Sequence, residues 1–272
     1  MIKAAVLGSP ISHSLSPLLH ALAYRELGRD FEYTRVKIER EDLLAFLESA
    51  APDWTGFSLT MPLKEEVLNF PSEISPLARR IHSANTLVRK AGNWNTTSTD
   101  VSGFTHALAA HDWDETGEVL IIGAGATARA AAAACDGKAD RISVMSRSIA
   151  RADAISNCVE ISDVEFVSWQ DYGAFEYANV IISTTPKGVT DSLVDFFPTQ
   201  KTALFFDVLY DPWPTAALKS WSSKGGAVVD GLDLLIHQAI EQVSIFSGES
   251  VDRGSMAALM RKYALDVLSS ST

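Results

Sequence analysis

One stretch of this 272-residue chain, from residue 118 to residue 151, constrains the fold more than any other. It begins with an apolar run at residues 119–122, which is typical of a strand buried on both faces. Small residues follow at once, and then comes an alanine-rich segment that favours a helix. A second apolar run, at residues 142–145, completes a β-α-β unit of the usual length.

The glycine-rich turn inside this unit has the arrangement that a dinucleotide requires. Gly123 allows a tight turn, Gly125 lets the backbone approach a pyrophosphate, and Ala128 keeps the helix close to the strand. The helix N-terminus offers unpaired N–H groups and the positive end of its dipole to the phosphates. A GxGxxA pattern alone is weak evidence, but between a strand and a helix it predicts a dinucleotide-binding site. The residues expected to form that site are Gly123, Ala124, Gly125, Ala126 and Thr127.

The end of the second strand indicates which dinucleotide is bound. An NAD site usually has Asp or Glu about 20 residues beyond the glycines, where it binds the ribose 2′-hydroxyl. This chain has Ser146, Arg147 and Ser148 there, with Arg151 one turn later. Guanidinium groups suit a 2′-phosphate, through charge-assisted hydrogen bonds and by stacking on adenine. Both arginines could instead be solvated surface residues, but two of them beside two hydroxyls favour NADP.

The composition is that of a soluble globular protein and excludes several other classes. A net charge of −11 argues against a nucleic-acid partner, which requires a basic surface. Cys135 and Cys158 have neither metal-ligand nor redox spacing, so we expect them to be buried small apolar residues. The N-terminal apolar run is too short for a secretory signal, and no run approaches the roughly 18 residues of a membrane span. We therefore expect a cytoplasmic protein.

The first hundred residues alternate between predicted strands and predicted helices. Short apolar runs predict strands, and longer amphipathic segments predict helices. The strands are expected at residues 2–7, 31–37 and 56–59, and the helices after Pro17 and at residues 41–47. This alternation predicts a mostly parallel α/β sheet in the N-terminal part of the chain as well.

The first of these helices follows directly on the first strand. Leu18, Leu22 and Leu27 are expected to form its apolar face. Ser14 and Ser16 lie between the strand and the helix, and their hydroxyls have two interpretations. They either cap the helix, or they bind a small polyol or a carboxylate at the end of the strand.

Further polar residues follow the ends of predicted elements. Lys64 comes just after the strand at residues 56–59, and this position favours a functional role over that of an ordinary surface lysine. Asn85 precedes a segment with a hairpin-like turn at residues 90–93. Asp100 stands directly before a helix predicted from about residue 101 to residue 110. We expect these side chains to take part in a site.

Taken together, these motifs resemble those of the shikimate dehydrogenase family. The N-terminal part contains SHSLSP at residues 12–17, LTMPLK at 59–64, ANT at 84–86 and STD at 98–100. After the glycine turn come STTPKG at residues 183–188, DVLYDPWPT at 207–215 and GLDLLIHQA at 231–239. The motifs follow the order of the family, and the resemblance extends over essentially the whole chain.

The resemblance implies a fold and a reaction. The fold is an α/β substrate domain at residues 1–99, completed by helices at 237–272, and a Rossmann-like NADP-binding domain at 100–236. The reaction is the NADPH-dependent, reversible reduction of 3-dehydroshikimate to shikimate in chorismate biosynthesis, by a monomer or a homodimer. Lys64 and Asp100 fall on the catalytic positions of the family. Its substrate-binding positions correspond to Ser14, Ser16, Thr60, Asn85, Tyr210 and Gln238, and its further cofactor positions to Thr184, Thr185, Pro186 and Gly231.

Two departures from the family pattern leave alternatives open. Ser58 and Ser98 stand where the family commonly has Asn, which indicates a weaker hold on Asp100 or a different substrate. The rival functions are a quinate/shikimate dehydrogenase and a catalytically idle sensor that binds shikimate-like ligands. The sequence also leaves open whether Lys64 acts alone as the base or together with Asp100. No histidine has ligand spacing, so no metal is expected.

Overall fold

The computed structural model describes residues 1–113, 117–198 and 203–270. The chain divides into two compact units. Unit 1 comprises Met1–Gly103 and Leu235–Thr272, and unit 2 comprises Phe104–Leu234. Each division falls within a helix, the first within α5 (Asp100–Ala109) and the second within α10 (Gly231–Ser247).

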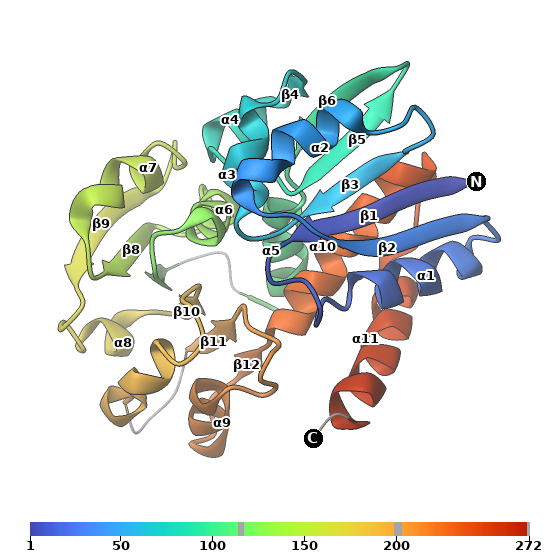
Figure 1. The fold of residues 1–272 in the computed structure, drawn as a ribbon. Coiled ribbons are helices and arrows are strands. Elements are labelled where there is room, and N and C mark those ends of the chain that lie inside the picture. Colours follow the sequence, from blue (N-terminus) through green and yellow to red (C-terminus); the bar gives the residue numbers. More distant parts are fainter. Residues whose placement is uncertain (114–116, 199–202, 271–272) are drawn as a thin grey trace. The chain divides into compact units, whose positions relative to one another are not determined.

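Unit 1 is built on a mixed sheet with the strand order β2-β1-β3-β5-β6-β4 (Figure 1). The strands β1, β2 and β3 are parallel, whereas β5 is antiparallel to both of its neighbours, β3 and β6. The strands are β1 (Ile2–Gly8), β2 (Phe31–Lys37), β3 (Gly56–Leu59), β4 (Glu73–Ile74), β5 (Thr86–Lys90) and β6 (Asn93–Thr97). The predicted parallel sheet is confirmed for β1 to β3, and the hairpin-like turn joins β5 to β6.

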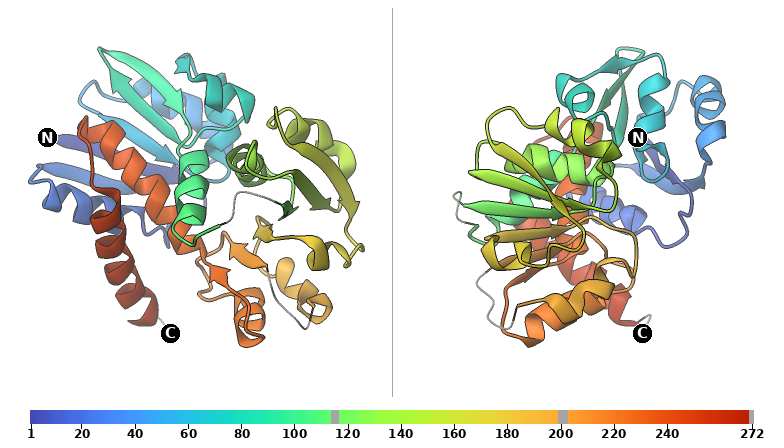
Figure 2. Two further views of the ribbon diagram at one scale, coloured as in Figure 1. Left: turned by 180° about the vertical axis from the view of Figure 1, so that it is seen from behind. Right: turned by 90° about the vertical axis from the view of Figure 1, so that its left-hand side faces the viewer.

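Helices cover both faces of this sheet. Those confined to unit 1 are α1 (Ser16–Glu26), η1 (Arg40–Asp42), α2 (Leu43–Ser49), α3 (Leu63–Glu66), η2 (Val67–Asn69), α4 (Pro76–Arg80) and α11 (Arg253–Ser270). Figures 1 and 2, which view the sheet from opposite sides, show α2 on one face and α10 on the other. Phe57 and Leu59 of β3 belong to the apolar cluster under α2, while Gly56 lies against Phe246 of α10. Successive residues of β3 therefore serve opposite faces of the sheet.

The buried face of α1 differs from the sequence prediction. Leu18 and Leu22 are only half-buried, whereas His20 and Tyr24 are fully buried. The His20 ring stacks on Tyr33 of β2 with 4.0 Å between centroids, and its Nδ1 lies 3.1 Å from the Tyr24 hydroxyl. The predicted apolar face was wrong because these polar rings have hydrogen-bond partners inside the protein, so that their burial is not costly.

Unit 2 contains an all-parallel sheet with the order β12-β11-β10-β7-β8-β9. This is the strand order of dinucleotide-binding Rossmann folds, in which the order reverses between the first and the fourth strand, here β7 and β10. Its strands are β7 (Glu118–Ile122), β8 (Arg141–Ser146), β9 (Asp163–Ser168), β10 (Val180–Ser183), β11 (Leu204–Asp207) and β12 (Val228–Val229). Its helices are α6 (Ala126–Cys135), η3 (Ile149–Arg151), α7 (Ala152–Ser156), α8 (Ala174–Tyr177), η4 (Thr190–Phe196) and α9 (Ala216–Ser223).

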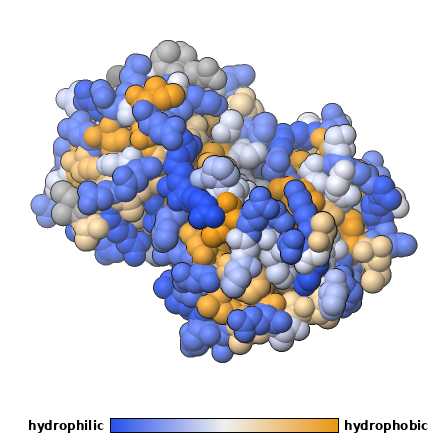
Figure 3. Space-filling model, turned by 90° about the horizontal axis from the view of Figure 1, so that it is seen from above, coloured by the Kyte–Doolittle hydropathy of each residue, from blue (hydrophilic) through white to orange (hydrophobic). Residues whose placement is uncertain are grey.

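The two cysteines, the hydropathy of the surface and the character of the helices can each be compared with what the composition predicts. Cys135 and Cys158 are both fully buried and neither forms a disulfide, as expected for small apolar residues. On the face drawn in Figure 3, hydrophobic residues form small groups separated by hydrophilic ones. Within the described residues, no helix has both the length and the apolar character needed to cross a membrane.

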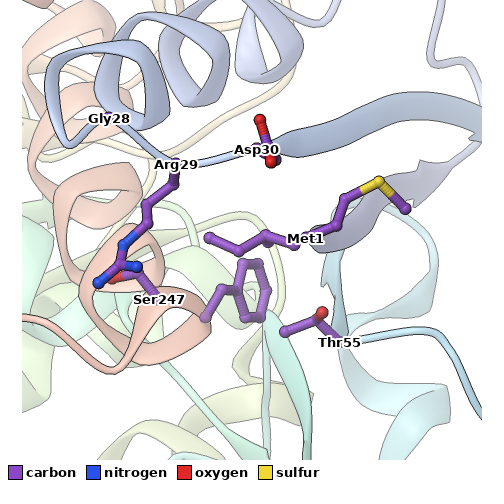
Figure 4. A pocket seen from close by; sticks show the side chains of 8 residues that line it. Met1, Gly28, Arg29, Asp30, Thr55 and Ser247 are labelled. Carbon is purple, nitrogen blue, oxygen red and sulfur yellow. The ribbon is translucent and has the colours of Figure 1, made fainter.

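A pocket of about 360 Å³ opens at the amino-terminal ends of β1 and β3 in unit 1 (Figure 4). Ile2, Asp30 and Thr55 contribute to its wall, and Arg29 pairs with Glu249. The loops that carry the predicted site residues follow the carboxyl ends of the same strands. The pocket therefore lies at the opposite edge of the sheet from those loops.

Candidate active site

Lys64 and Asp100 form an ion pair in unit 1. Lys64 lies in the short helix α3 that follows β3, and Asp100 is the first residue of α5. Lys64 Nζ donates to Asp100 Oδ2 over 2.6 Å. The Asp100 side chain is only 5% exposed, while that of Lys64 is 18% exposed. The carboxylate thus holds the ammonium group in place, and part of the lysine side chain remains accessible to a ligand.

Asn85 holds the other side of the Asp100 carboxylate. Its Nδ2 donates to Asp100 Oδ1 over 2.8 Å, and its Oδ1 accepts from the Thr99 backbone N–H, also over 2.8 Å. Asn85 is buried at the start of β5, and its carbonyl accepts from the Leu59 N–H at the end of β3. Each oxygen of the Asp100 carboxylate therefore has a donor.

Gln238 of α10 completes this cluster. Its Oε1 accepts from Asn85 Nδ2 over 3.2 Å, and its Nε2 donates to the Leu235 carbonyl. The structure thus brings together four residues that the sequence proposed separately, namely Lys64, Asn85, Asp100 and Gln238. The cluster offers an ammonium group and two amides, which suit a ligand that carries several oxygens.

Three hydroxyl residues follow β1 and β3, namely Ser14 and Thr60 in loops and Ser16 at the first position of α1. The Ser16 N–H donates to Ser14 Oγ over 3.3 Å, and Arg35 holds the Ser14 carbonyl with Nη2 at 2.6 Å. Leu15 is the N-cap of α1, and no side chain makes the N-cap hydrogen bond. Thr60 lies against Gly8, where an added Cβ would overlap its methyl group. The carboxyl ends of parallel strands share one sheet edge, so these loops border the same edge as Lys64.

The two serines that depart from the family pattern both have partners. Ser58 Oγ accepts from the Tyr33 hydroxyl over 2.7 Å and donates to Gln242 Oε1 over 2.8 Å. Ser98 Oγ accepts from the Asp100 N–H over 3.4 Å, at the start of α5. Asp100 retains the donors described above, so the carboxylate is held without an asparagine at either position.

The sequence reasoning missed Gln242 and Thr86, which also belong to this buried polar cluster. Gln242 is 1% exposed and donates to Thr86 Oγ1 over 2.9 Å. A signal for it exists in the sequence, because Gln242 follows Gln238 by four residues in a helix and therefore lies on the same face. Thr86 belongs to the ANT motif at residues 84–86, although the sequence did not single it out as a site residue.

The glycine turn of unit 2 follows β7, at the point where the strand order reverses. Gly123 has a φ of +111°, which favours glycine, and Gly125 is the N-cap of α6. No side-chain hydrogen bond caps this helix. Thr184 braces the turn, since its Oγ1 donates to the Ile122 carbonyl over 2.9 Å. Ala124 is buried, while Ala126 and Thr127 are partly exposed in the first turn of α6. A helix N-terminus of this kind fits a phosphate group.

Arg147 and three serines, Ser146, Ser148 and Ser168, line a second pocket of about 310 Å³ at the ends of β8 and β9. Arg147 lies over the Trp169 ring, 5.8 Å from its centroid, and both residues line the pocket. Ser146 Oγ donates to the Ser148 carbonyl over 3.1 Å, so the hydroxyls shape the turn itself. Arg151 Nη1 lies 3.8 Å from where a Cβ on Gly125 would stand. Guanidinium groups thus lie near both the glycine turn and this pocket.

The remaining predicted residues of unit 2 have structural contacts of their own. Thr185 Oγ1 lies 2.7 Å from Thr190 Oγ1 in the segment after β10, to which Pro186 also belongs. Gly231 begins α10, and a Cβ there would overlap the Val208 carbonyl. Tyr210 lies in the loop after β11, and it is the one predicted substrate residue that belongs to unit 2.

Burial shifts the pKa values of several ionisable groups, among them His20 and Asp207. Burial lowers the pKa of His20 to about 3, against a smaller opposing effect of its hydrogen bond to Gln242. Burial also raises the pKa of the Asp207 carboxyl, which accepts from Thr215 Oγ1 over 2.8 Å. With its pKa lowered to about 3, the His20 ring is neutral.

Among the described residues, no group of three or more His, Cys, Asp or Glu side chains has a geometry able to hold a metal ion.

Family models match both units. The model described as "Shikimate dehydrogenase substrate binding domain" matches residues 6–87, and the one described as "Shikimate / quinate 5-dehydrogenase" matches residues 105–207. The chain is 33% identical to a shikimate dehydrogenase (NADP(+)) of Nostoc sp. over 260 residues, which cover 89% of each protein.

Solved structures show the same fold over nearly the whole chain. Mycobacterium tuberculosis shikimate dehydrogenase is 35% identical, with a TM-score of 0.86 that covers 97% of this chain and 100% of that chain. Shikimate 5-dehydrogenase of Thermus thermophilus, crystallised with NADP(H) and shikimate, is 30% identical, with a TM-score of 0.85 that covers 96% and 99%. These similarities confirm the fold class expected from the sequence.

Proposed function

The chain belongs to the shikimate dehydrogenase family, and on that premise we propose that it catalyses the NADP-dependent, reversible reduction of 3-dehydroshikimate to shikimate. The observation that carries the proposal is the Lys64–Asp100 pair, with 2.6 Å between Nζ and Oδ2. An ammonium group that is both held and partly accessible is suited to give a proton to an oxygen that becomes an alkoxide.

NADPH, when bound, supplies the hydride that reduces the ring carbonyl. Lys64 then donates a proton from Nζ to the carbonyl oxygen, and in the oxidative direction the neutral amine takes the hydroxyl proton back. Asp100 holds Nζ in the orientation for this transfer and compensates its charge. In this assignment Lys64 exchanges the proton and Asp100 positions it, so the two act as a dyad.

We assign the cofactor site to the turn after β7 and to the pocket at the ends of β8 and β9. The N-terminus of α6, which no side chain caps, supports pyrophosphate binding at Gly123, Ala124, Gly125, Ala126 and Thr127. The family pattern adds four further cofactor positions, Thr184, Thr185, Pro186 and Gly231. Arg147 and Arg151, with Ser146 and Ser148, support a 2′-phosphate, because no carboxylate stands at the end of β8. This arrangement favours NADP over NAD.

The substrate site that we propose is rich in hydroxyl and amide groups. Ser14, Ser16 and Tyr210 would bind the substrate carboxylate, while Asn85, Gln238 and Thr60 would bind ring hydroxyls. A site that bonds particular hydroxyls rejects analogues that lack them. In this proposal the substrate domain comprises residues 1–99 and 237–272, and the NADP domain comprises residues 100–236.

The cellular setting that we propose is the cytoplasm, with the enzyme present as a monomer or a homodimer. Cys135 and Cys158 form no disulfide, which supports a reducing compartment. Light scattering of the purified protein at several concentrations would separate the two states of assembly.

Steady-state kinetics with four pairings test this function. Formation of NADPH or NADH is followed with shikimate or quinate as the substrate and NADP⁺ or NAD⁺ as the cofactor. We expect the highest kcat/KM for shikimate with NADP⁺. A preference for quinate would make the chain a quinate/shikimate dehydrogenase. If shikimate binds in calorimetry but no pairing is turned over, the chain is a sensor and the proposed function is wrong.

A further inference from the structure

Gln242 of α10 connects the proposed catalytic cluster to a second buried group of polar side chains. Its Nε2 donates to the Asn85 carbonyl over 3.0 Å and to Thr86 Oγ1 over 2.9 Å. Its Oε1 accepts from Ser58 Oγ over 2.8 Å. Gln242 is 1% exposed, so all of these bonds lie away from water, where an unpaired group is costly.

The bond to Thr86 contributes one of the donors that orient the Asn85 amide. Because Thr86 Oγ1 accepts from Gln242, its own proton is directed to Asn85 Oδ1, 2.8 Å away. Asn85 Oδ1 also accepts from the Thr99 N–H. With its oxygen occupied by these donors, Asn85 must direct Nδ2 to Asp100 Oδ1, at 2.8 Å. A flipped amide would instead set an oxygen against the carboxylate.

The orientation of the Gln242 amide is determined in the same way from the other side. The Tyr33 hydroxyl donates to Ser58, which leaves the Ser58 proton for Gln242 Oε1. The neutral His20 ring lies with Nε2 3.3 Å from the same oxygen and Nδ1 3.1 Å from the Tyr24 hydroxyl. These partners are all satisfied if Tyr24 donates to Nδ1 and Nε2–H donates to Gln242. Two donors therefore converge on Oε1, and this directs Nε2 to Asn85 and Thr86.

We propose that Gln242 is a positioning residue of the active site, which acts by orienting Asn85 so that Asn85 holds Asp100 against Lys64. The proposal rests on the function proposed above and assigns a role that the Lys64–Asp100 pair alone does not reveal. The proposal also explains the hydroxyl of Ser58, which accepts from Tyr33 and donates to Gln242 and so helps to orient the Gln242 amide.

The test compares Gln242→Met, of similar volume but without hydrogen-bonding groups, with Val243→Ala. Val243 is fully buried in the same turn of α10 and makes no polar link to the cluster, so this control reports on lost packing alone. The first readout is kcat/KM for shikimate in a double-mutant cycle with Asn85→Ala. The second is the hydrogen-exchange rate of the Asn85 side-chain amide, measured by NMR and assigned through its loss in Asn85→Ala.

We expect Gln242→Met to lower kcat/KM about 10-fold, because one or two hydrogen bonds to the cluster are lost. In the Asn85→Ala background the same change should cost less than about 3-fold, because the group through which Gln242 acts is gone. The Asn85 amide should exchange at least about 10-fold faster in Gln242→Met and within about 2-fold of wild type in Val243→Ala.

The proposal is overturned if the losses of the two single variants multiply in the double variant. It is equally overturned if Gln242→Met behaves like Val243→Ala in both readouts. Amide exchange requires no turnover, so it decides the positioning role even if the wild-type protein does not oxidise shikimate. That last result would refute the proposed function and leave Gln242 to be judged by exchange alone.

Discussion

Replacing Lys64 with Met separates the chemical role of the lysine from its structural role. The variant keeps the length of the side chain and removes the ammonium group that faces Asp100 at 2.6 Å. Loss of a general acid–base group lowers the rate by about 100- to 10 000-fold, and we expect a fall in kcat within this range. Initial rates at saturating shikimate and NADP⁺ measure the fall.

The same variant should also destabilise the protein. Asp100 is 5% exposed, and without Lys64 its carboxylate keeps the amide of Asn85 as a donor but has lost the opposing charge. Removing one partner of a buried ion pair costs about 3 to 5 kcal/mol. Because Lys64 is partly exposed, we expect the lower end, about 3 kcal/mol, which lowers the unfolding temperature by roughly 6 to 12 °C for a chain of this size.

The double variant Lys64→Met/Asp100→Asn tests this reasoning. It removes the uncompensated charge, so about 2 kcal/mol of stability should return, while kcat should stay as low as in the single variant. Calorimetry would then show a recovery of stability, while kinetics would show no recovery of kcat. A single variant that keeps kcat within 10-fold of wild type would refute the chemical role. A double variant no more stable than the single one would refute the account of the buried charge.

Three further predictions concern the cofactor, the pH and one glycine. Arg147→Ala/Arg151→Ala should raise the KM for NADP⁺ by about 10- to 100-fold and leave that for NAD⁺ within 3-fold; equal effects on both cofactors would exclude a role at the 2′-phosphate. His20 is neutral when folded but takes up a proton on unfolding below its ordinary pKa of 6.5, so stability should fall by slightly more than 1 kcal/mol for each pH unit from about 6 towards 3. Urea unfolding at each pH should show this slope in wild type and a shallower one in His20→Gln; equal slopes would contradict the assignment. Gly231→Ala should cost about 1 to 3 kcal/mol, because its Cβ overlaps the Val208 carbonyl, and an unchanged unfolding temperature would show that α10 shifts freely.

Local pattern was sufficient to predict the first strands and helices of each unit. The strands expected at residues 31–37 and 56–59 coincide with β2 and β3. β3 is buried throughout, whereas in β2 only Tyr33 is buried. The helix expected at residues 41–47 is observed as η1 followed by α2, which ends at Ser49. The glycine turn likewise has one favourable place, between β7 and α6.

What the sequence did not predict depends on partners that are distant in the chain. The inner face of α1 carries His20 because Tyr33 and Gln242 contact it, and His20 in turn bonds Tyr24. Neither Tyr33 nor Gln242 can be inferred from the helix itself. Gln242 was missed for the same reason, since its role comes from side chains on β3 and β5. Hydrophobic periodicity is evaluated within one helix or strand at a time, and it predicts that polar residues lie on the exposed side.

The alternation along β3 has a consequence for how this protein can evolve. Phe57 packs into the apolar cluster and Ser58 bonds Gln242, although the two residues are neighbours in a strand of four residues. In a library that randomises both positions, selection for protein abundance alone should restrict Phe57 to large apolar residues and tolerate several small ones at Ser58. Selection for growth that depends on the enzyme should restrict both positions. Adaptation of the substrate site could then proceed through one side of the strand while the other side preserves the folded protein.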